Sequence, residues 1–317
     1  MSDKKFDVVA LGELLIDFVE NGISFQSNPL FEANPGGAPC NVLAMLSNLG
    51  NKTAFIGKVG DDFFGHMLAD TIRECGIGTD GLVFDKNVPT TLALVHKKPD
   101  GDRDFSFYRN PGADMMLKDT DIKEKLIEEA DLFHFGTLSM TDSEVEKATV
   151  KAVDIAKKNG LLISFDPNYR APLWDNEEKA KEKMDYGFRN CDILKISDDE
   201  ILFFTGKNTI EEGMECILEN YSIKLICATL GKDGSIAFYN GKKVIAKSVP
   251  NPNVIETTGA GDTFMGCVID YCLHHDFNNL SEDMLREMLV RANNAASIIT
   301  TRKGALKVMP KLKEIHS

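Results

Sequence analysis

The stretch LFHFGTLSMTDSEVEKATVKAVDIAKKNGLLISF, residues 132–165, holds a strand, a helix and a second strand in succession. Two short apolar runs, 132–135 and 161–165, flank a segment over 142–158 whose apolar residues recur at helical spacing. Thr141 and Glu144 supply an N-cap signal for that helix, and Gly160 stands where a helix C-cap belongs. This pattern predicts parallel strands covered by helices.

The same alternation continues along most of the chain, which predicts an α/β fold. Further strands are expected at 6–11, 54–59, 193–196 and 225–229, followed by an antiparallel pair at 235–239 and 243–248. Further helices are expected at 39–49, 64–75, 177–189, 210–219, 263–274 and 281–300. The central sheet should therefore be mostly parallel.

Two segments, about 14–34 and 90–114, interrupt this alternation of strands and helices. The second is predicted to be a hairpin, with Pro99-Asp100-Gly101 in the turn between strands at 91–96 and 104–108. Together the two segments could form a small β-sheet that covers a site as a lid. No repeat or linker divides the chain, so residues 1–317 are expected to form a single domain.

Composition excludes several classes of function. The 317 residues are 43% hydrophobic, and 36 Lys and Arg face 49 Asp and Glu, for a net charge of −13. Such a charge opposes binding to nucleic acid or to an anionic membrane. No apolar run reaches the roughly 20 residues of a membrane helix, and no signal peptide is evident, so a cytoplasmic protein is expected. Seven cysteines without a C-x-x-C pair indicate reduced thiols.

The segment ETTGAGDTF, residues 256–264, is the most informative for chemistry, because it precedes an apolar helix. Gly259, Ala260 and Gly261 let main-chain N–H groups converge on an anion at the positive end of that helix. Asp262 would face the bound anion, where it could take a proton from an attacking hydroxyl. A flexible turn with an aspartate helix cap remains an equal alternative from this segment alone.

A second glycine-containing segment, PGGAPCN at 35–41, leads into another helix. Gly36 and Gly37 permit close approach of a small ligand, and Asn41 offers a donor and an acceptor to hydroxyl groups. A strand–helix loop that needs positive φ is the competing interpretation.

Three polar segments follow predicted strands, at the edge where open α/β sheets bind ligands. They are FDPNYR at 165–170, KISDDE at 195–200 and TLGKDG at 229–234. The last could hold phosphates or simply turn the chain. Ser197 and Glu200 form a capping box, so Ser197 is expected to cap a helix.

One motif is dismissed as a site. GIGTDG at 76–81 matches a dinucleotide fingerprint, but it follows a helix rather than opening one. The chain also lacks the G-x-x-x-x-G-K-[ST] of a P-loop.

These segments, in their order along the chain, carry a resemblance to a known family. Together with GELLIDF at 12–18, FIGKVGDD at 55–62 and FYR at 107–109, they span about residues 6–308. The sequence resembles the ribokinase-like (PfkB) family of carbohydrate kinases, and specifically its fructokinase branch. The resemblance implies a Rossmann-like α/β sandwich with a β-lid, and transfer of the γ-phosphoryl group of ATP to a sugar, with D-fructose the first choice.

The resemblance also implies roles for individual residues. Asp262 would be the general base, and the anion hole would be formed by Gly259, Ala260 and Gly261. The sugar would be held by Asp17, Gly36, Gly37, Asn41, Arg109, reaching in from the lid, and Arg170, which would also approach the transferred phosphate. The nucleotide would be held by Asn168, Lys195, Thr229, Gly231, Gly234, Gly259, Gly261 and Asn293. Mg²⁺ would arrive with ATP, and Glu200 would contact it through water.

Some positions leave alternatives open. Glu256 stands where the family commonly has Asp near a monovalent-cation site, which puts activation by K⁺ in doubt. Lys195 and Ser197 replace part of the N-x-x-E motif of ribokinases, which favours fructokinases. A 2-keto-3-deoxygluconate kinase, an aminoimidazole riboside kinase and a non-catalytic sugar sensor remain alternatives. A homodimer through the lid is also open, because Phe105 and Phe107 can equally pack inward.

Overall fold

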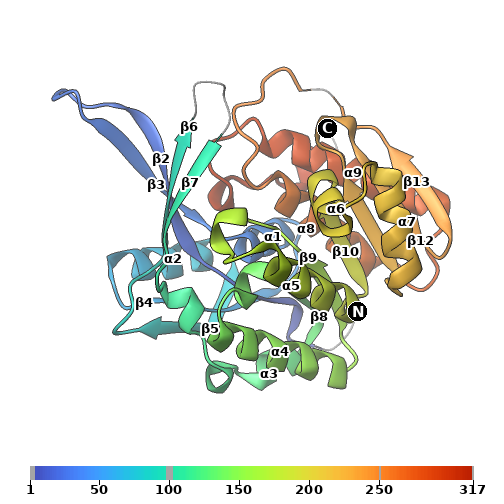
Figure 1. The fold of residues 1–317 in the computed structure, drawn as a ribbon, viewed down its shortest axis with the longest axis horizontal. Helices are drawn as coiled ribbons and strands as arrows, with labels where there is room; N and C mark the ends of the chain where they lie inside the picture. The colour runs from blue at the N-terminus through green and yellow to red at the C-terminus, as the bar shows by residue number, and fades with distance from the viewer. Residues whose placement is uncertain (1–3, 98–102, 250, 316–317) are drawn as a thin grey trace.

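The computed structural model describes residues 4–97, 103–249 and 251–315, and its centre is a nine-stranded sheet (Figure 1). From one edge to the other, the strands are β13 (Lys242–Ala246), β12 (Ser235–Tyr239), β11 (Leu225–Thr229), β10 (Ile193–Ser197), β9 (Leu162–Asp166), β8 (Ala130–Gly136), β1 (Phe6–Leu11), β4 (Thr53–Gly60) and β5 (Ile77–Asp85). Neighbouring strands from β11 to β5 are parallel, whereas β12 and β13 are antiparallel. The expected mostly parallel sheet is confirmed.

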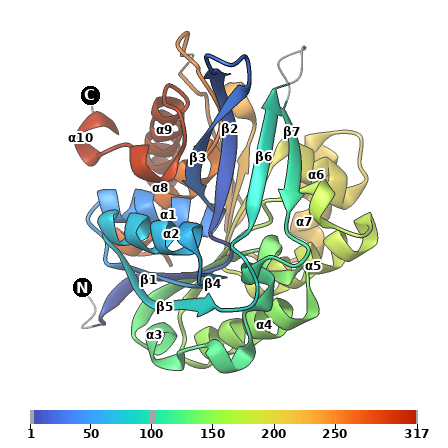
Figure 2. The ribbon, with the colours of Figure 1, turned by 90° about the vertical axis from the view of Figure 1, so that its left-hand side faces the viewer.

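Helices cover both faces of this sheet (Figure 2). One face packs against α1 (Ala38–Asn48), α2 (Phe63–Glu74), α8 (Ala260–His274) and α9 (Glu282–Ile299). The other packs against α3 (Glu124–Glu128), α4 (Ser143–Lys158), α5 (Glu177–Asn190), α6 (Asp198–Thr205) and α7 (Ile210–Asn220). The short α10 (Leu312–Ile315) follows near the end of the described chain. In β1, Val8 and Ala10 belong to the first core and Val9 and Leu11 to the second, which explains why residues 8–11 of this strand are all apolar.

A second sheet of four strands stands away from the large one (Figure 1). Its order is β3 (Pro29–Gly36), β2 (Leu15–Ile23), β6 (Leu92–Lys97) and β7 (Arg103–Tyr108). β6 and β7 are antiparallel, as the hairpin prediction requires, and β2 runs parallel to β6. The predicted turn at 98–102 lies outside the described residues.

Most predicted element boundaries agree with the structure to within two residues, and the differences have local causes. Helix α8 begins at Ala260, three residues earlier than predicted, because Gly259 adopts a left-handed φ of 77° as its N-cap. The prediction of Thr141 as the cap of α4 is wrong: the Asp142 side chain accepts the bond from Glu144 N at 3.0 Å. The dismissed GIGTDG segment lies in β5, a strand that was not predicted.

Two general expectations can be compared with the described chain. All seven cysteines are free. Within residues 4–97, 103–249 and 251–315, every helix is too short or too polar to cross a membrane.

A buried charge cluster fixes α8 against its neighbours. Asp270 accepts a hydrogen bond from Asn51 Nδ2 at 2.7 Å, and its other oxygen lies 2.7 Å from Arg291 of α9. Both Asp270 and Asn51 are buried. Because a buried charge needs a partner, this cluster specifies how α8 sits between α9 and the loop before β4.

Replacing Asp270 by Ala is expected to lower the free energy of unfolding by about 3 kcal/mol, because Arg291 loses its partner in a largely buried position. Unfolding in urea measures this change. Asp70→Ala is the control, since Asp70 pairs with Arg73 on the surface, and a change of about 0.5 kcal/mol or less is expected there. Equal effects of the two substitutions would contradict the assigned role.

Candidate active site

A cleft of about 1240 Å³ opens between the carboxyl ends of the large sheet's strands and the small sheet. Strands β9, β10 and β11 contribute residues at or just after their ends, and β2, β6 and β7 contribute from the small sheet. The predicted site residues that line it are Asp17, Gly36, Gly37, Asn41, Asn168, Arg170, Lys195, Glu200, Thr229, Gly231, Gly234, Gly259, Ala260, Gly261, Asp262 and Asn293. The fold thus brings together segments from the whole chain.

Asp262 lies in the first turn of α8 and is 9% exposed. Its Oδ2 accepts a hydrogen bond from Asn41 Nδ2 at 2.8 Å. Burial raises the pKa of Asp262, although the Asn41 bond and the charges of Lys195 and Arg170 act in the opposite direction. A carboxylate with a raised pKa at the floor of a cleft is suited to accept a proton.

Lys195 is surrounded by acidic groups. It is 6% exposed, and its Nζ lies 3.1 Å from Asp166 Oδ2. Burial alone would lower the pKa of Lys195, but the charges of Asp166, Glu200 and Asp262 raise it. The site therefore holds a permanent positive charge between β9, β10 and the start of α8.

The start of α8 is shaped by its glycines. A Cβ on Gly261 would lie 3.0 Å from Lys195 Nζ, so the ammonium packs closely against this part of the backbone. Ala260 N donates to Thr257 O at 3.2 Å, so this member of the predicted anion hole is engaged within the protein in this structure. The remaining first-turn N–H groups of a helix have no intrahelical acceptor and attract anions.

The sugar end of the predicted site is closely packed. A Cβ on Gly36 would lie 2.3 Å from Asp17 Oδ2, and one on Gly37 would lie 2.4 Å from Glu13 O. Gly37 also has a φ of 128°, as the loop interpretation required. The loop interpretation of PGGAPCN is therefore confirmed, and the same loop places Asn41 beside Asp262.

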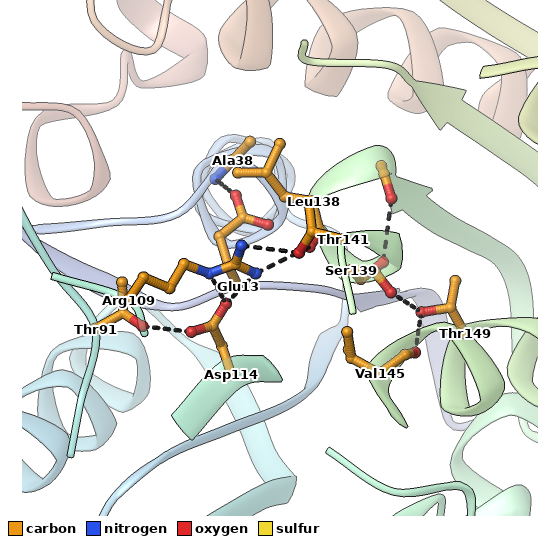
Figure 3. A network of polar contacts seen from close by, with 11 residues as sticks. Glu13, Ala38, Thr91, Arg109, Asp114, Leu138, Ser139, Thr141, Val145 and Thr149 are labelled. Carbon is orange, nitrogen blue, oxygen red and sulfur yellow. Dashed lines mark hydrogen bonds and ion pairs between the residues drawn. The ribbon is translucent and has the colours of Figure 1, made fainter. Parts of the chain in front are cut away.

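Arg109 does not reach into the cleft, contrary to the expectation from the resemblance. Its guanidinium is buried, donates from Nε to Asp114 Oδ2 at 2.8 Å, and donates to Thr141 Oγ1 and Leu138 O (Figure 3). The side chains of Arg109 and Asp114 in this ion pair are 3% and 2% exposed. A guanidinium with several buried acceptors is held at the base of the small sheet.

The nucleotide end of the predicted site lies along β11, β12 and α9. Thr229, Gly231 and Gly234 line the wall, and Gly234 has a φ of 107° in the turn before β12. The Asn293 amide accepts from Ser235 Oγ at 3.0 Å and donates to Ala246 O at 3.1 Å. Asn293 thus shapes the wall through internal bonds.

The acidic residues of the site are largely committed to protein donors. Glu200 accepts from Tyr169 N and Ser197 N, each at 2.8 Å, which confirms the predicted capping box. Burial would raise the pKa of Glu200, but Lys195 and these N–H groups lower it. Glu256 accepts from Gly304 N at 2.8 Å. No cluster of three metal-ligating side chains occurs among the described residues.

Glu13 and Asp166 also line this region, although the sequence assigned them no role. Each is an acidic residue at the carboxyl end of a predicted parallel strand, and this position is the signal in the sequence that indicates a site residue. Burial raises the pKa of Glu13 to about 7 and also raises that of Asp166.

Comparison with known proteins agrees with this geometry. The model of the pfkB family carbohydrate kinases matches residues 5–312. The chain belongs to the pfkB family of carbohydrate kinases. It is 40% identical to a probable fructokinase-2 of Arabidopsis thaliana over 310 residues, which cover 97% of this chain and 94% of that protein.

Solved structures of fructokinases share the whole fold. A fructokinase from Xylella fastidiosa with bound ATP superposes with a TM-score of 0.89 at 27% identity, covering 98% of this chain and 97% of the other. A fructokinase double mutant from Vibrio cholerae O395 with fructose, ADP and potassium ion also has a TM-score of 0.89 at 27% identity, covering 100% and 99%.

Replacing Lys195 by Met is expected to raise the pKa of Asp262 further, because the ammonium lowers that pKa in the intact site. The titration of the Asp262 carboxyl carbon, followed by NMR, measures the change without requiring activity. Lys183→Met is the matched control, since Lys183 is a mostly buried, ion-paired lysine outside the cleft. An unchanged or lower pKa in Lys195→Met would contradict the assigned electrostatics.

Proposed function

We propose that this pfkB-family kinase is an ATP-dependent fructokinase, which converts ATP and D-fructose to ADP and D-fructose 6-phosphate. The observation that carries the proposal is the position of Asp262, buried at the start of α8, hydrogen-bonded to Asn41 and facing one cleft with the predicted sugar and nucleotide residues. Phosphoryl transfer requires alignment of the two substrates and a group that takes the hydroxyl proton.

In this proposal Asp262 accepts the proton of the C6 hydroxyl as that oxygen attacks the γ-phosphorus. Asp17 and Asn41 hold sugar hydroxyls, and Gly36 and Gly37 keep the backbone close to the ring. The N–H groups at the start of α8, together with Arg170, stabilise charge on the transferring group. A divalent metal, which we take to be Mg²⁺, neutralises charge on the phosphates of ATP.

The state of Arg109 supports a neutral sugar over an acidic one. A carboxylate on the substrate would need a cation, but Arg109 is paired with Asp114 and Lys195 with Asp166. Arg170, which also lines the cleft, is assigned to the transferring phosphate in this proposal. Leu15, Val95 and Leu138, which line the cleft near the small sheet, are apolar. These features disfavour 2-keto-3-deoxygluconate as the acceptor.

The proposal includes the organisation of the whole chain. We take residues 1–317 as one kinase domain in which the small sheet, formed by segments at about 14–34 and 90–114, closes over the sugar and excludes water. A homodimer through this lid is supported by exposed apolar side chains of the β2–β3 hairpin, namely Ile23, Phe25, Leu30 and Phe31. The seven free cysteines support a reducing, cytoplasmic location.

ADP release in a coupled assay tests the proposal directly. With MgATP, we expect fructose to give a kcat/KM roughly tenfold or more above those of glucose, mannose, ribose and 2-keto-3-deoxygluconate, because a site that hydrogen-bonds the hydroxyl groups of one sugar leaves polar groups unpaired with another. Highest activity with 2-keto-3-deoxygluconate would contradict the assigned substrate. Absence of sugar-dependent ADP release across the panel would favour a non-catalytic sensor.

A further inference from the structure

Glu13 occupies the junction between the large sheet, α1 and the small sheet. It follows β1, is 4% exposed, and its Oε1 accepts a hydrogen bond from Ala38 N at 2.8 Å. Ala38 is the first residue of α1, where an N–H group has no intrahelical acceptor. Figure 3 shows the Glu13 carboxylate directed at Ala38, with the Arg109 guanidinium beside it.

The backbone around this bond is too closely packed to accept a Cβ atom at either neighbouring glycine. A Cβ on Gly12 would lie 2.4 Å from Pro39 Cγ, and a Cβ on Gly37 would lie 2.4 Å from Glu13 O. The end of β1 and the first turn of α1 therefore touch directly. No side chain separates these two backbone segments. The Glu13–Ala38 hydrogen bond therefore fixes the position of the first residue of α1.

The first turn of α1 leads to the catalytic centre. Asn41, three residues after Ala38, donates to Asp262 Oδ2 at 2.8 Å. Asn41 is buried, and none of the described residues donates to its Oδ1. A single hydrogen bond thus connects this amide to Asp262, so a displacement of the helix start would move the Asp262 carboxylate or break the bond.

Glu13 also adjoins the base of the small sheet. The charges of Asp114 and Arg109 both act on its carboxyl group. Asp114 accepts from Thr91 Oγ1, next to β6, and pairs with Arg109, next to β7. Glu13 therefore lies between the strands that would cover the sugar and the helix that orients Asp262.

We propose that Glu13 is a positioning residue for phosphoryl transfer: it holds the start of α1 through Ala38 and thereby orients Asp262 through Asn41. This inference rests on the proposed kinase function. The part that Glu13 plays is that of a hydrogen-bond acceptor at one fixed position, so an uncharged acceptor of the same length can replace it.

Three substitutions of Glu13 separate the effects of its hydrogen-bond acceptor, its charge and the length of its side chain. Glu13→Ala removes the acceptor, Glu13→Asp keeps the charge but withdraws the acceptor by one methylene, and Glu13→Gln keeps an acceptor at full length. We expect kcat with fructose to fall by roughly 30-fold or more in the Ala and Asp variants, because misplacement of the base slows transfer, with the KM for ATP within about threefold of wild type. Glu13→Gln should keep kcat within about threefold.

Thr209→Ala is the matched control, because Thr209 likewise accepts from a first-turn N–H, that of Glu212 in α7, away from the cleft. It should leave kcat within about twofold of wild type, and thermal unfolding shows whether each variant is folded. If Glu13→Ala does not fold, the Asp and Gln variants decide the question.

Two results would overturn the inference. One is a folded Ala or Asp variant with a kcat near that of wild type. The other is a Gln variant as slow as the Asp variant, which would show that an uncharged acceptor of full length does not replace Glu13. Inactivity of the wild-type protein towards every sugar would instead count against the proposed function.

Discussion

The hydrogen bond from Asn41 to Asp262 joins residues 221 positions apart and connects the first turns of α1 and α8 at the cleft. It exists because α1 and α8 pack side by side on one face of the large sheet, with their first turns at the cleft. Gly266 permits this approach, since a Cβ there would lie 2.8 Å from Met45 of α1. The buried Asp270 cluster fixes α8 from the other end. Packing in the core thus determines the direction of one carboxylate.

Positive groups are gathered at one place in a cleft whose charged lining residues, like those of the whole chain, are mainly acidic. A net charge of −13 would repel ATP, but the cleft holds Lys195, Arg170 and the N-terminal end of α8. Asp166 and Glu200 keep Lys195 charged in a buried position, and Lys195 in turn limits the rise in the pKa of Asp262. Local arrangement, rather than total charge, therefore decides which anion can bind.

Much of the fold was predictable from the sequence, because buried parallel strands and amphipathic helices leave simple patterns. β1 was predicted to the residue, as were β11 and β12. Strand β5 could not be predicted, because its glycines, polar residues and mixed burial give no alternation of apolar and polar residues along the strand. The start of α8 was missed by three residues because Gly259 caps the helix through backbone geometry and not through a side chain.

The site was predictable where a motif lies at a strand end or a helix start, and less so where partners come from elsewhere. Asp262, Asn41 and Lys195 meet in the cleft as expected. Arg109 does not reach the cleft, because its guanidinium forms an ion pair with Asp114, five residues later. The role of Glu13 could not be predicted, since its bond to Ala38 depends on tertiary packing that sequence spacing does not reveal.

Single-turnover phosphoryl transfer by Asp262→Asn tests the central claim most directly, because asparagine keeps the size of the side chain and removes the base. The account predicts that transfer from ATP to fructose slows by roughly 1,000-fold or more while the Kd for ATP stays within about threefold. Transfer within about tenfold of the wild-type rate would contradict the assignment of Asp262 as the base.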